Sequence, residues 1–187
     1  MQKIIPAILP QSYRAIEMGA EKVHEAVDTV QIDFVDGTFA SNRTWVFNNK
    51  DGNIVSEILA QDRGLPFWED LNYEFDLMVA NPLEYMETFI AMGPSKIIFH
   101  IEGLDVDAVI SYIENLPEII KDSIAFGIAI GIETPVEALE KIAPHVASIQ
   151  CMGIVHVGFQ SQVFDERCIA KVAEVRALYP DKIIAVD

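Results

Sequence analysis

Two aspartates near the carboxyl ends of apolar segments are the residues best suited to chemistry in this chain. Asp33 lies in the apolar run that starts at Thr29, and Asp187 follows the run 182–186. In an all-parallel sheet or barrel, the carboxyl ends of the strands meet at one edge, where the active sites of such folds are built. Two carboxylates that face one small molecule could take a proton from one side of a carbon atom and return a proton to the other side. The pair therefore predicts proton-transfer chemistry.

The elements that must position these aspartates alternate along the whole chain. Short β-branched runs predict strands, and apolar stripes with helical spacing predict the helices between them. The run 124–130 is apolar without alternation, as is typical of parallel strands covered on both faces. The repeats predict a doubly wound sheet or a (β/α)8 barrel, which needs one strand more than we count. We expect strands over residues 3–9, 30–35, 73–79, 96–101, 124–130, 147–154 and 182–186, and helices over residues 13–26, 53–61, 82–92, 106–115, 135–142 and 166–178.

Length and charge limit the classes of function. The 187 residues are 51% hydrophobic and 22% charged, which predicts a single domain over residues 1–187 with a sizeable core. With 13 Lys+Arg against 29 Asp+Glu, the formal net charge of -16 argues against a nucleic acid or an anionic membrane surface as partner. A small anion could still be held by backbone N–H groups.

Cysteine usage and hydropathy indicate the compartment. Cys151 and Cys168 have no spacing that suggests a disulfide framework or a thiolate zinc site, which fits a reducing compartment. No run of eighteen apolar residues occurs, and the first residues read as a strand rather than a signal segment. We expect a cytoplasmic protein that does not bind membranes.

The longest irregular stretch is the segment 40–52, which contains Trp45 and Phe47. Loops of that length over an α/β fold are often binding loops or lids, and disorder is the alternative.

Short motifs at the predicted strand ends resemble one family. In order they read Pro6-Ala-Ile-Leu9, Gln31-Ile-Asp-Phe-Val-Asp-Gly-Thr-Phe39, Asp76-Leu-Met-Val79 before Asn81-Pro82, His100-Ile-Glu102, Thr134-Pro-Val-Glu-Ala-Leu139, Gly158-Phe159 and Val186-Asp187. Over nearly the whole chain, this series resembles ribulose-phosphate 3-epimerase. The resemblance implies a TIM (β/α)8 barrel of the ribulose-phosphate-binding type, with the last β/α unit absent from this chain, because the sequence stops at Asp187 where the family continues.

The resemblance also implies an activity in the pentose phosphate pathway of carbohydrate metabolism. The family interconverts D-ribulose 5-phosphate and D-xylulose 5-phosphate through a metal-stabilised enediolate, with two aspartates as acid and base. Those aspartates match Asp33 and Asp187. Asp36, which precedes Gly37, is instead expected to be a turn residue. A related ketose phosphate is an alternative substrate.

The metal site departs from the family pattern. Gln31 and Asp76 occupy the positions of the two histidine ligands, so that Gln31, Asp33, Asp76 and Asp187 form an oxygen-only set of candidate ligands. Such a set suits Mg2+ or Mn2+ better than Zn2+ or Fe2+.

The substrate positions depart from the family in part as well. The family's serine is Ala7 here, and the phosphate loop 155–162 has lost a pair of glycines. His100 and two methionines match positions that line the family's pocket, although each could equally be an ordinary core residue. The substrate-binding residues that the resemblance implies are Ala7, Met78, His100, Met152, Gly158, Phe159 and Gln162.

Two other functions remain open. Because several site residues are replaced together, the chain could be a catalytically inactive relative that serves as a binding or assembly module. It could also be a different Mg2+-dependent, enolate-forming barrel enzyme. For the epimerase we expect a small sugar phosphate as the partner, no nucleic acid, and assembly as a homo-oligomer.

Overall fold

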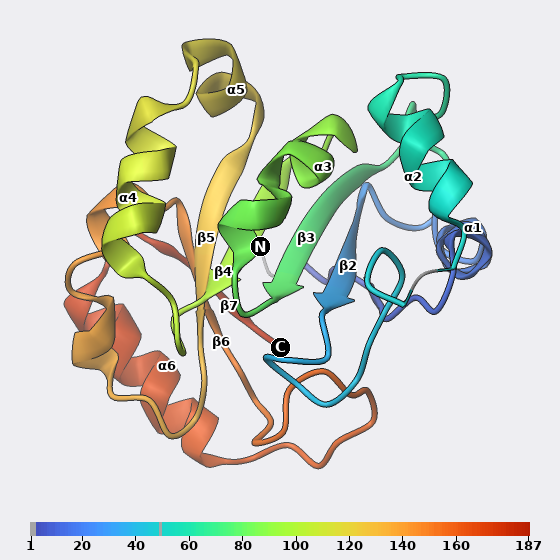
Figure 1. The fold of residues 1–187 in the computed structure, drawn as a ribbon. Helices are drawn as coiled ribbons and strands as arrows, with labels where there is room; N and C mark the ends of the chain where they lie inside the picture. Colours follow the sequence, from blue (N-terminus) through green and yellow to red (C-terminus); the bar gives the residue numbers. More distant parts are fainter. Residues whose placement is uncertain (1–2, 49) are drawn as a thin grey trace. The chain divides into compact units, whose positions relative to one another are not determined.

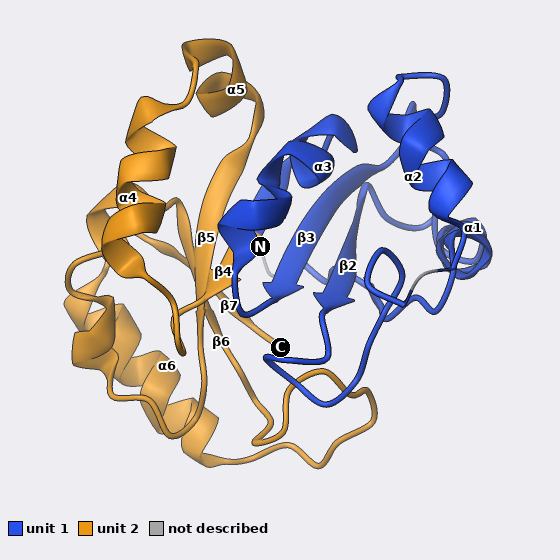
Figure 2. Cartoon of the chain, in the orientation of Figure 1, with its two compact units in different colours: residues 1–97 blue, residues 98–187 orange. Residues whose placement is uncertain are grey.

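The computed structural model describes residues 3–48 and 50–187. It divides into two compact units, Met1–Ile97 and Ile98–Asp187 (Figure 2). The boundary falls inside strand β4 (Lys96–His100) rather than in a linker. Nothing in this division tests whether residues 1–187 fold as one domain, so that expectation stays a prediction.

The first unit contains three parallel strands. β1 (Ala7–Ile8) pairs with β2 (Thr29–Val35), and β2 pairs with β3 (Asn72–Met78). The start of β4 adjoins β3, because Ser95 N donates to Tyr73 O at 2.8 Å. The helices of this unit are α1 (Tyr13–Glu21), α2 (Gly52–Leu59), the 3-10 helix η1 (Pro82–Tyr85) and α3 (Met86–Ala91). Figure 1 labels α1, α2 and α3.

Aromatic side chains form much of the core of the first unit. The Phe34 ring lies 5.0 Å from the Phe75 ring and 4.9 Å from the Phe89 ring, measured between centroids. Every residue of β2 is buried. The strand is therefore covered on both faces, although Gln31 and Asp33 interrupt its apolar residues.

The second unit repeats the alternation of strand and helix. β5 (Ala125–Ile130), β6 (Ser148–Cys151) and β7 (Ile183–Val186) are parallel neighbours, and Ile101 N, just after β4, donates to Ala129 O at 3.0 Å. Ile128, Ile149 and Val175 are fully buried in its core. Its helices are α4 (Val106–Asn115), α5 (Glu118–Ser123), the 3-10 helices η2 (Val136–Leu139) and η3 (Ala143–His145), and α6 (Arg167–Leu178).

Several elements differ from their predicted form. The helix predicted over 82–92 starts as η1 before α3, and the helix predicted over 13–26 ends at Glu21. β1 has two residues instead of the run 3–9, because it is bracketed by Pro6 and Pro10, which lack the N–H that a strand ladder needs. The helix predicted over 135–142 is instead the 3-10 helix η2, and η3 follows it from Ala143, where Pro144 has no N–H with which an α-helix could continue. Helix α5 was not expected, since it buries no residue and so has no apolar stripe in the sequence.

The centre of the segment 40–52 is packed into the first unit. Thr44 and Trp45 are fully buried. Trp45 N donates to Pro10 O at 2.8 Å, and the Thr44 hydroxyl accepts from Val35 N at 2.8 Å. Residue 49 lies outside the described residues.

Within residues 3–48 and 50–187, no helix combines the length and the apolar character that crossing a membrane requires.

Candidate active site

Strands β2 and β3 bring three of the predicted site residues together in the first unit. Asp33 is in register with Asp76, and Gln31 lies two residues before Asp33. Because side chains alternate along a strand and register partners in a parallel pair share a face, all three belong to one face of the sheet. Gln31 and Asp33 are each 6% exposed and Asp76 is 0% exposed. The strands therefore gather two carboxylates and an amide in a place that water hardly reaches.

The amide of Gln31 orients the first aspartate. Gln31 Nε2 donates to Asp33 Oδ1 at 3.0 Å. A hydrogen bond from a neutral donor to a carboxylate stabilises the ionised form and limits rotation of the carboxyl group. Gln31 therefore restrains the orientation of the Asp33 carboxyl group.

The donor set of this cluster fits a hard cation. Asp33 and Asp76 supply carboxylate oxygens, and Gln31, whose Nε2 points to Asp33, can supply its carbonyl oxygen. Oxygen donors suit Mg2+ or Mn2+. The part of the chain that the structure describes holds no group of three or more His, Cys, Asp or Glu side chains placed for a metal. Within the first unit, the candidate donors for such an ion are two carboxylates and one amide.

Asp36 has the structural role expected of it. Its Oδ1 accepts from Thr38 N at 2.7 Å and from Phe39 N at 2.8 Å, and its Oδ2 accepts from Ala80 N at 2.9 Å. Its prediction as a turn residue is confirmed. The carboxylate fixes the turn after β2 and ties it to the end of β3.

The sequence reasoning missed an acidic residue on the same sheet face. Glu74 is in register with Gln31 and lies two residues before Asp76, a spacing that could have identified it. Its Oε1 lies 2.8 Å from Lys96 Nζ. The ion pair gives this carboxylate its own cation, so Glu74 is an anchor between β3 and β4 rather than a free ligand.

Ala7 and Met78 lie beside this cluster. Ala7 is in register with Gln31, and Met78, which is 3% exposed, is in register with Val35. Both belong to the strands that carry the carboxylates. Their predicted role in binding substrate stays a prediction.

The second unit holds Asp187 by its main chain. Asp187 N donates to Cys151 O at 3.1 Å, and Asp187 O accepts from Gly153 N at 2.5 Å. These two bonds continue the pairing of β6 with β7 by one residue. The Asp187 residue is exposed, while its main chain is fixed by these two bonds.

A carboxylate beside His100 ties two strand ends together. Glu102 Oε1 accepts from Gly131 N at 2.7 Å and from Thr134 Oγ1 at 2.6 Å. Its Oε2 lies 3.8 Å from Nδ1 of His100, a buried side chain. Glu102 and Thr134 both stand in motifs that carry the family resemblance, but the sequence analysis did not assign either residue to the site.

The remaining predicted substrate residues lie after β6. Met152 is buried against Ile98 and Ala129. Gly158 is buried with φ at 87°, a backbone conformation that favours glycine. Phe159 is 42% exposed, and Gln162 is also exposed.

The cysteines take no part in this chemistry. Burial raises the pKa of the Cys151 thiol to about 11 and also raises the pKa of Cys168. Because the thiolate is the nucleophile and the metal ligand, both groups are inert at neutral pH.

Comparison with known proteins identifies the family. The model of the ribulose-phosphate 3 epimerase family matches residues 3–187. Among similar proteins, a ribulose-phosphate 3-epimerase of Chlamydia pneumoniae is 29% identical over 173 residues, covering 91% of this chain and 67% of the relative. A second, from Eremothecium gossypii, is 28% identical over 192 residues, covering 98% and 74%.

A third relative, described as the cytoplasmic isoform of ribulose-phosphate 3-epimerase in Oryza sativa subsp. japonica, is 27% identical over 192 residues and covers 99% of this chain and 75% of the relative. The family match, together with the alternation of β-strands and helices, confirms the predicted fold class, a (β/α) barrel type with seven strands in the described residues. The chain belongs to the ribulose-phosphate 3-epimerase family.

Proposed function

We propose that this protein is a ribulose-phosphate 3-epimerase that interconverts D-ribulose 5-phosphate and D-xylulose 5-phosphate by proton transfer between two aspartates. The observation that carries the proposal is the buried cluster in which Gln31 Nε2 donates to Asp33 Oδ1 and Asp76 lies in register with Asp33. The family match over residues 3–187 supports the choice of substrate class. A related ketose phosphate is the alternative within the same chemistry.

In this proposal Asp33 is the base for D-ribulose 5-phosphate. Its carboxylate takes the proton from C3, and the electron pair moves into the C2 carbonyl to give an enediolate. Asp187, protonated at the start, then donates a proton to the opposite face of C3, which gives D-xylulose 5-phosphate. The reverse reaction exchanges the roles of the two carboxyl groups.

The buried carboxylates also suit a cation. We propose that Gln31, Asp33, Asp76 and Asp187 hold Mg2+ or Mn2+ rather than Zn2+ or Fe2+, because their donors are oxygens. When bound, the ion supplies positive charge that stabilises the oxygens of the enediolate.

We place the phosphate of the substrate at the loop after β6 and assign substrate contacts to Ala7, Met78, His100, Met152, Gly158, Phe159 and Gln162. The family names support the sugar phosphate as the small-molecule partner. Assembly as a homo-oligomer and location in the cytoplasm complete the proposal.

Deuterium incorporation at C3 of D-ribulose 5-phosphate tests the function. The purified protein is incubated in D2O with Mg2+, Mn2+ or Zn2+, and exchange is followed by NMR beside an Asp33→Asn variant. We expect exchange with Mg2+ or Mn2+ and at least a 100-fold loss in the variant, since removing a positioned acid–base group costs about 10²–10⁴-fold.

The same experiment separates the other two functions. Mg2+ binding measured by calorimetry without C3 exchange would favour a different enolate-forming enzyme. A folded protein that neither binds the ion nor exchanges C3 would favour the binding or assembly module and contradict the epimerase.

A further inference from the structure

The main chain of Asp187 is held by a glycine that has no space for a side chain. Gly153 N donates to Asp187 O at 2.5 Å. A Cβ built on Gly153 would lie 2.7 Å from Asp187 O and 2.8 Å from the Phe164 ring. A contact under 3.0 Å with a backbone atom forces a shift, so any larger residue at position 153 would displace Asp187 or move away from it.

The carbonyl group of Gly153 is bound to Asp165, the residue at the far end of the loop that follows β6. Gly153 O accepts from Asp165 N at 2.7 Å, so one residue joins Asp187 to Asp165. The loop between Gly153 and Asp165 is thereby closed at its base. The position of Asp165 and the position of the Asp187 main chain are set together.

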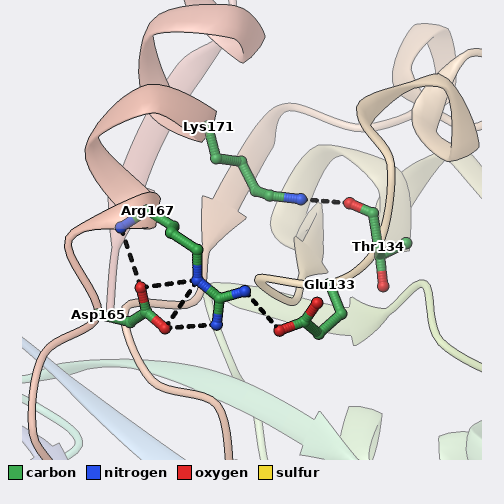
Figure 3. A network of polar contacts seen from close by, with 5 residues as sticks. All are labelled: Glu133, Thr134, Asp165, Arg167 and Lys171. Carbon is green, nitrogen blue, oxygen red and sulfur yellow. Dashed lines mark hydrogen bonds and ion pairs between the residues drawn. The ribbon is translucent and has the colours of Figure 1, made fainter.

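A cluster of charged side chains fixes Asp165 (Figure 3). Arg167 Nε and Nη2 bind the Asp165 carboxylate at 3.0–3.1 Å and 2.6 Å, and Arg167 Nη1 binds Glu133 Oε1 at 2.7 Å. Arg167 N also donates to Asp165 Oδ1 at 3.0 Å. Hydrogen bonds from Arg167 hold the pKa of the Asp165 carboxyl below its usual range. The Asp165 carboxylate is therefore stabilised in its ionised form opposite Arg167.

A second contact ties the same helix to the same loop. Lys171 Nζ, one turn along α6 from Arg167, donates to Thr134 O. Thr134 is in turn bound through its hydroxyl to Glu102. Two basic side chains of α6 thus bind the loop after β5. These contacts fix the start of α6 and, with it, Asp165.

We propose that Gly153 and the Asp165–Arg167–Glu133 cluster are positioning residues for Asp187, and that they aim its carboxyl group at C3 of the substrate. The inference rests on the proposed function. The ion pair of Arg167 with Glu133 is exposed, and such pairs contribute little to stability. A variant that lacks it should therefore keep its fold, so that a change in its reaction rate reports on positioning. A displacement of about 1 Å at a catalytic group can lower the rate about 10²-fold.

Because the proposed epimerase uses two bases, deuterium exchange through each aspartate can be measured separately. A merely structural role would not change one of the two exchange rates alone. Deuterium enters unreacted D-ribulose 5-phosphate through Asp33 and unreacted D-xylulose 5-phosphate through Asp187. We expect Gly153→Ala to slow exchange into D-xylulose 5-phosphate about 10- to 100-fold and Arg167→Gln to slow it about 3- to 10-fold. At saturating sugar, where weaker binding of the phosphate no longer limits the rate, exchange into D-ribulose 5-phosphate should stay within about 2-fold, because Asp33 and Gln31 are untouched.

Two further variants serve as controls. Arg176→Gln removes a guanidinium from the same helix, where it binds Pro180 O and Lys182 O, and should leave both exchange rates unchanged. Gly153→Ala combined with Phe164→Ala removes the clash with the ring and keeps the clash with Asp187 O. The double variant should therefore remain as slow as Gly153→Ala.

The main-chain amide of Asp187 gives a second measurement that needs no activity. Its 15N–1H signal should shift, and its hydrogen exchange should accelerate, in Gly153→Ala and Arg167→Gln but not in Arg176→Gln. Equal losses for both sugars, or an Asp187 amide that is unchanged in the first two variants, would overturn the positioning role. If the wild-type protein exchanges neither sugar, the proposed function fails, and the amide measurement alone decides whether Asp187 is positioned in this way.

Discussion

At the scale of single residues, the chemistry of the site depends on two positions at which an amide and a carboxylate stand in place of histidines. Gln31 and Asp76 occupy the places where the resemblance expects imidazoles, and the structure puts both on the sheet face that carries Asp33. An amide and a carboxylate keep the capacity to hold a cation but change which cation is preferred. Gln31 also supplies a donor to Asp33 that a metal-bound imidazole would not.

Restoring the imidazoles should change the metal preference. We expect Gln31→His combined with Asp76→His to raise the affinity for Co2+ and Zn2+ at least 10-fold, because imidazole nitrogen suits these ions better than amide oxygen. Calorimetry and the visible absorbance of bound Co2+ measure this without any turnover. Gln11→His with Asp70→His makes the same changes at exposed positions and should have no such effect. Equal Co2+ affinity in the two double variants would show that residues 31 and 76 do not hold the metal.

At the scale of elements, the strands were predictable and several turns were not. β2 and β3 follow from runs in which apolar residues alternate with polar ones, and this alternation places Asp33 and Asp76 among the polar positions of their strands. Helix α5 could not be predicted, since it buries no side chain and so leaves no stripe in the sequence. The contact between Gly153 and Asp187 joins residues distant in the chain, and no local pattern encodes such an approach.

The centre of the segment 40–52 is packed against the end of β2, although its sequence has no regular pattern. Its centre is packed because the Thr44 hydroxyl accepts from Val35 N, at the end of the strand that carries Asp33. We expect Thr44→Val to lower the free energy of unfolding by about 1–3 kcal/mol, since it leaves a buried N–H without its acceptor. Chemical denaturation measures the difference.

Thr44→Ser is the matched control for this change. It keeps the hydroxyl and removes one methyl group, so a loss of about 0.8 kcal/mol is expected from burial alone. Thr44→Val proteins that are as stable as Thr44→Ser proteins would mean that the hydroxyl does not secure the end of β2.

At the scale of the whole molecule, the two compact units meet within a single strand. The boundary lies between Ile97 and Ile98, in the middle of β4, and the two ends of that strand adjoin β3 and β5 respectively. Domains that fold independently are usually separated by exposed linkers with few contacts across them. A boundary inside a buried strand instead predicts that the units lose their structure together.

Equilibrium unfolding in urea can test this cooperativity because each unit carries its own probe. Trp45 and Trp68 both belong to the first unit, whereas Cys151 and Cys168 both belong to the second and are buried. Tryptophan fluorescence and the labelling of thiols should therefore report the same midpoint, and far-UV circular dichroism should coincide with both, as expected of one cooperative transition. Thiols that react at a urea concentration where the fluorescence is still native would show that the second unit unfolds separately, and the chain would then consist of two domains instead of one.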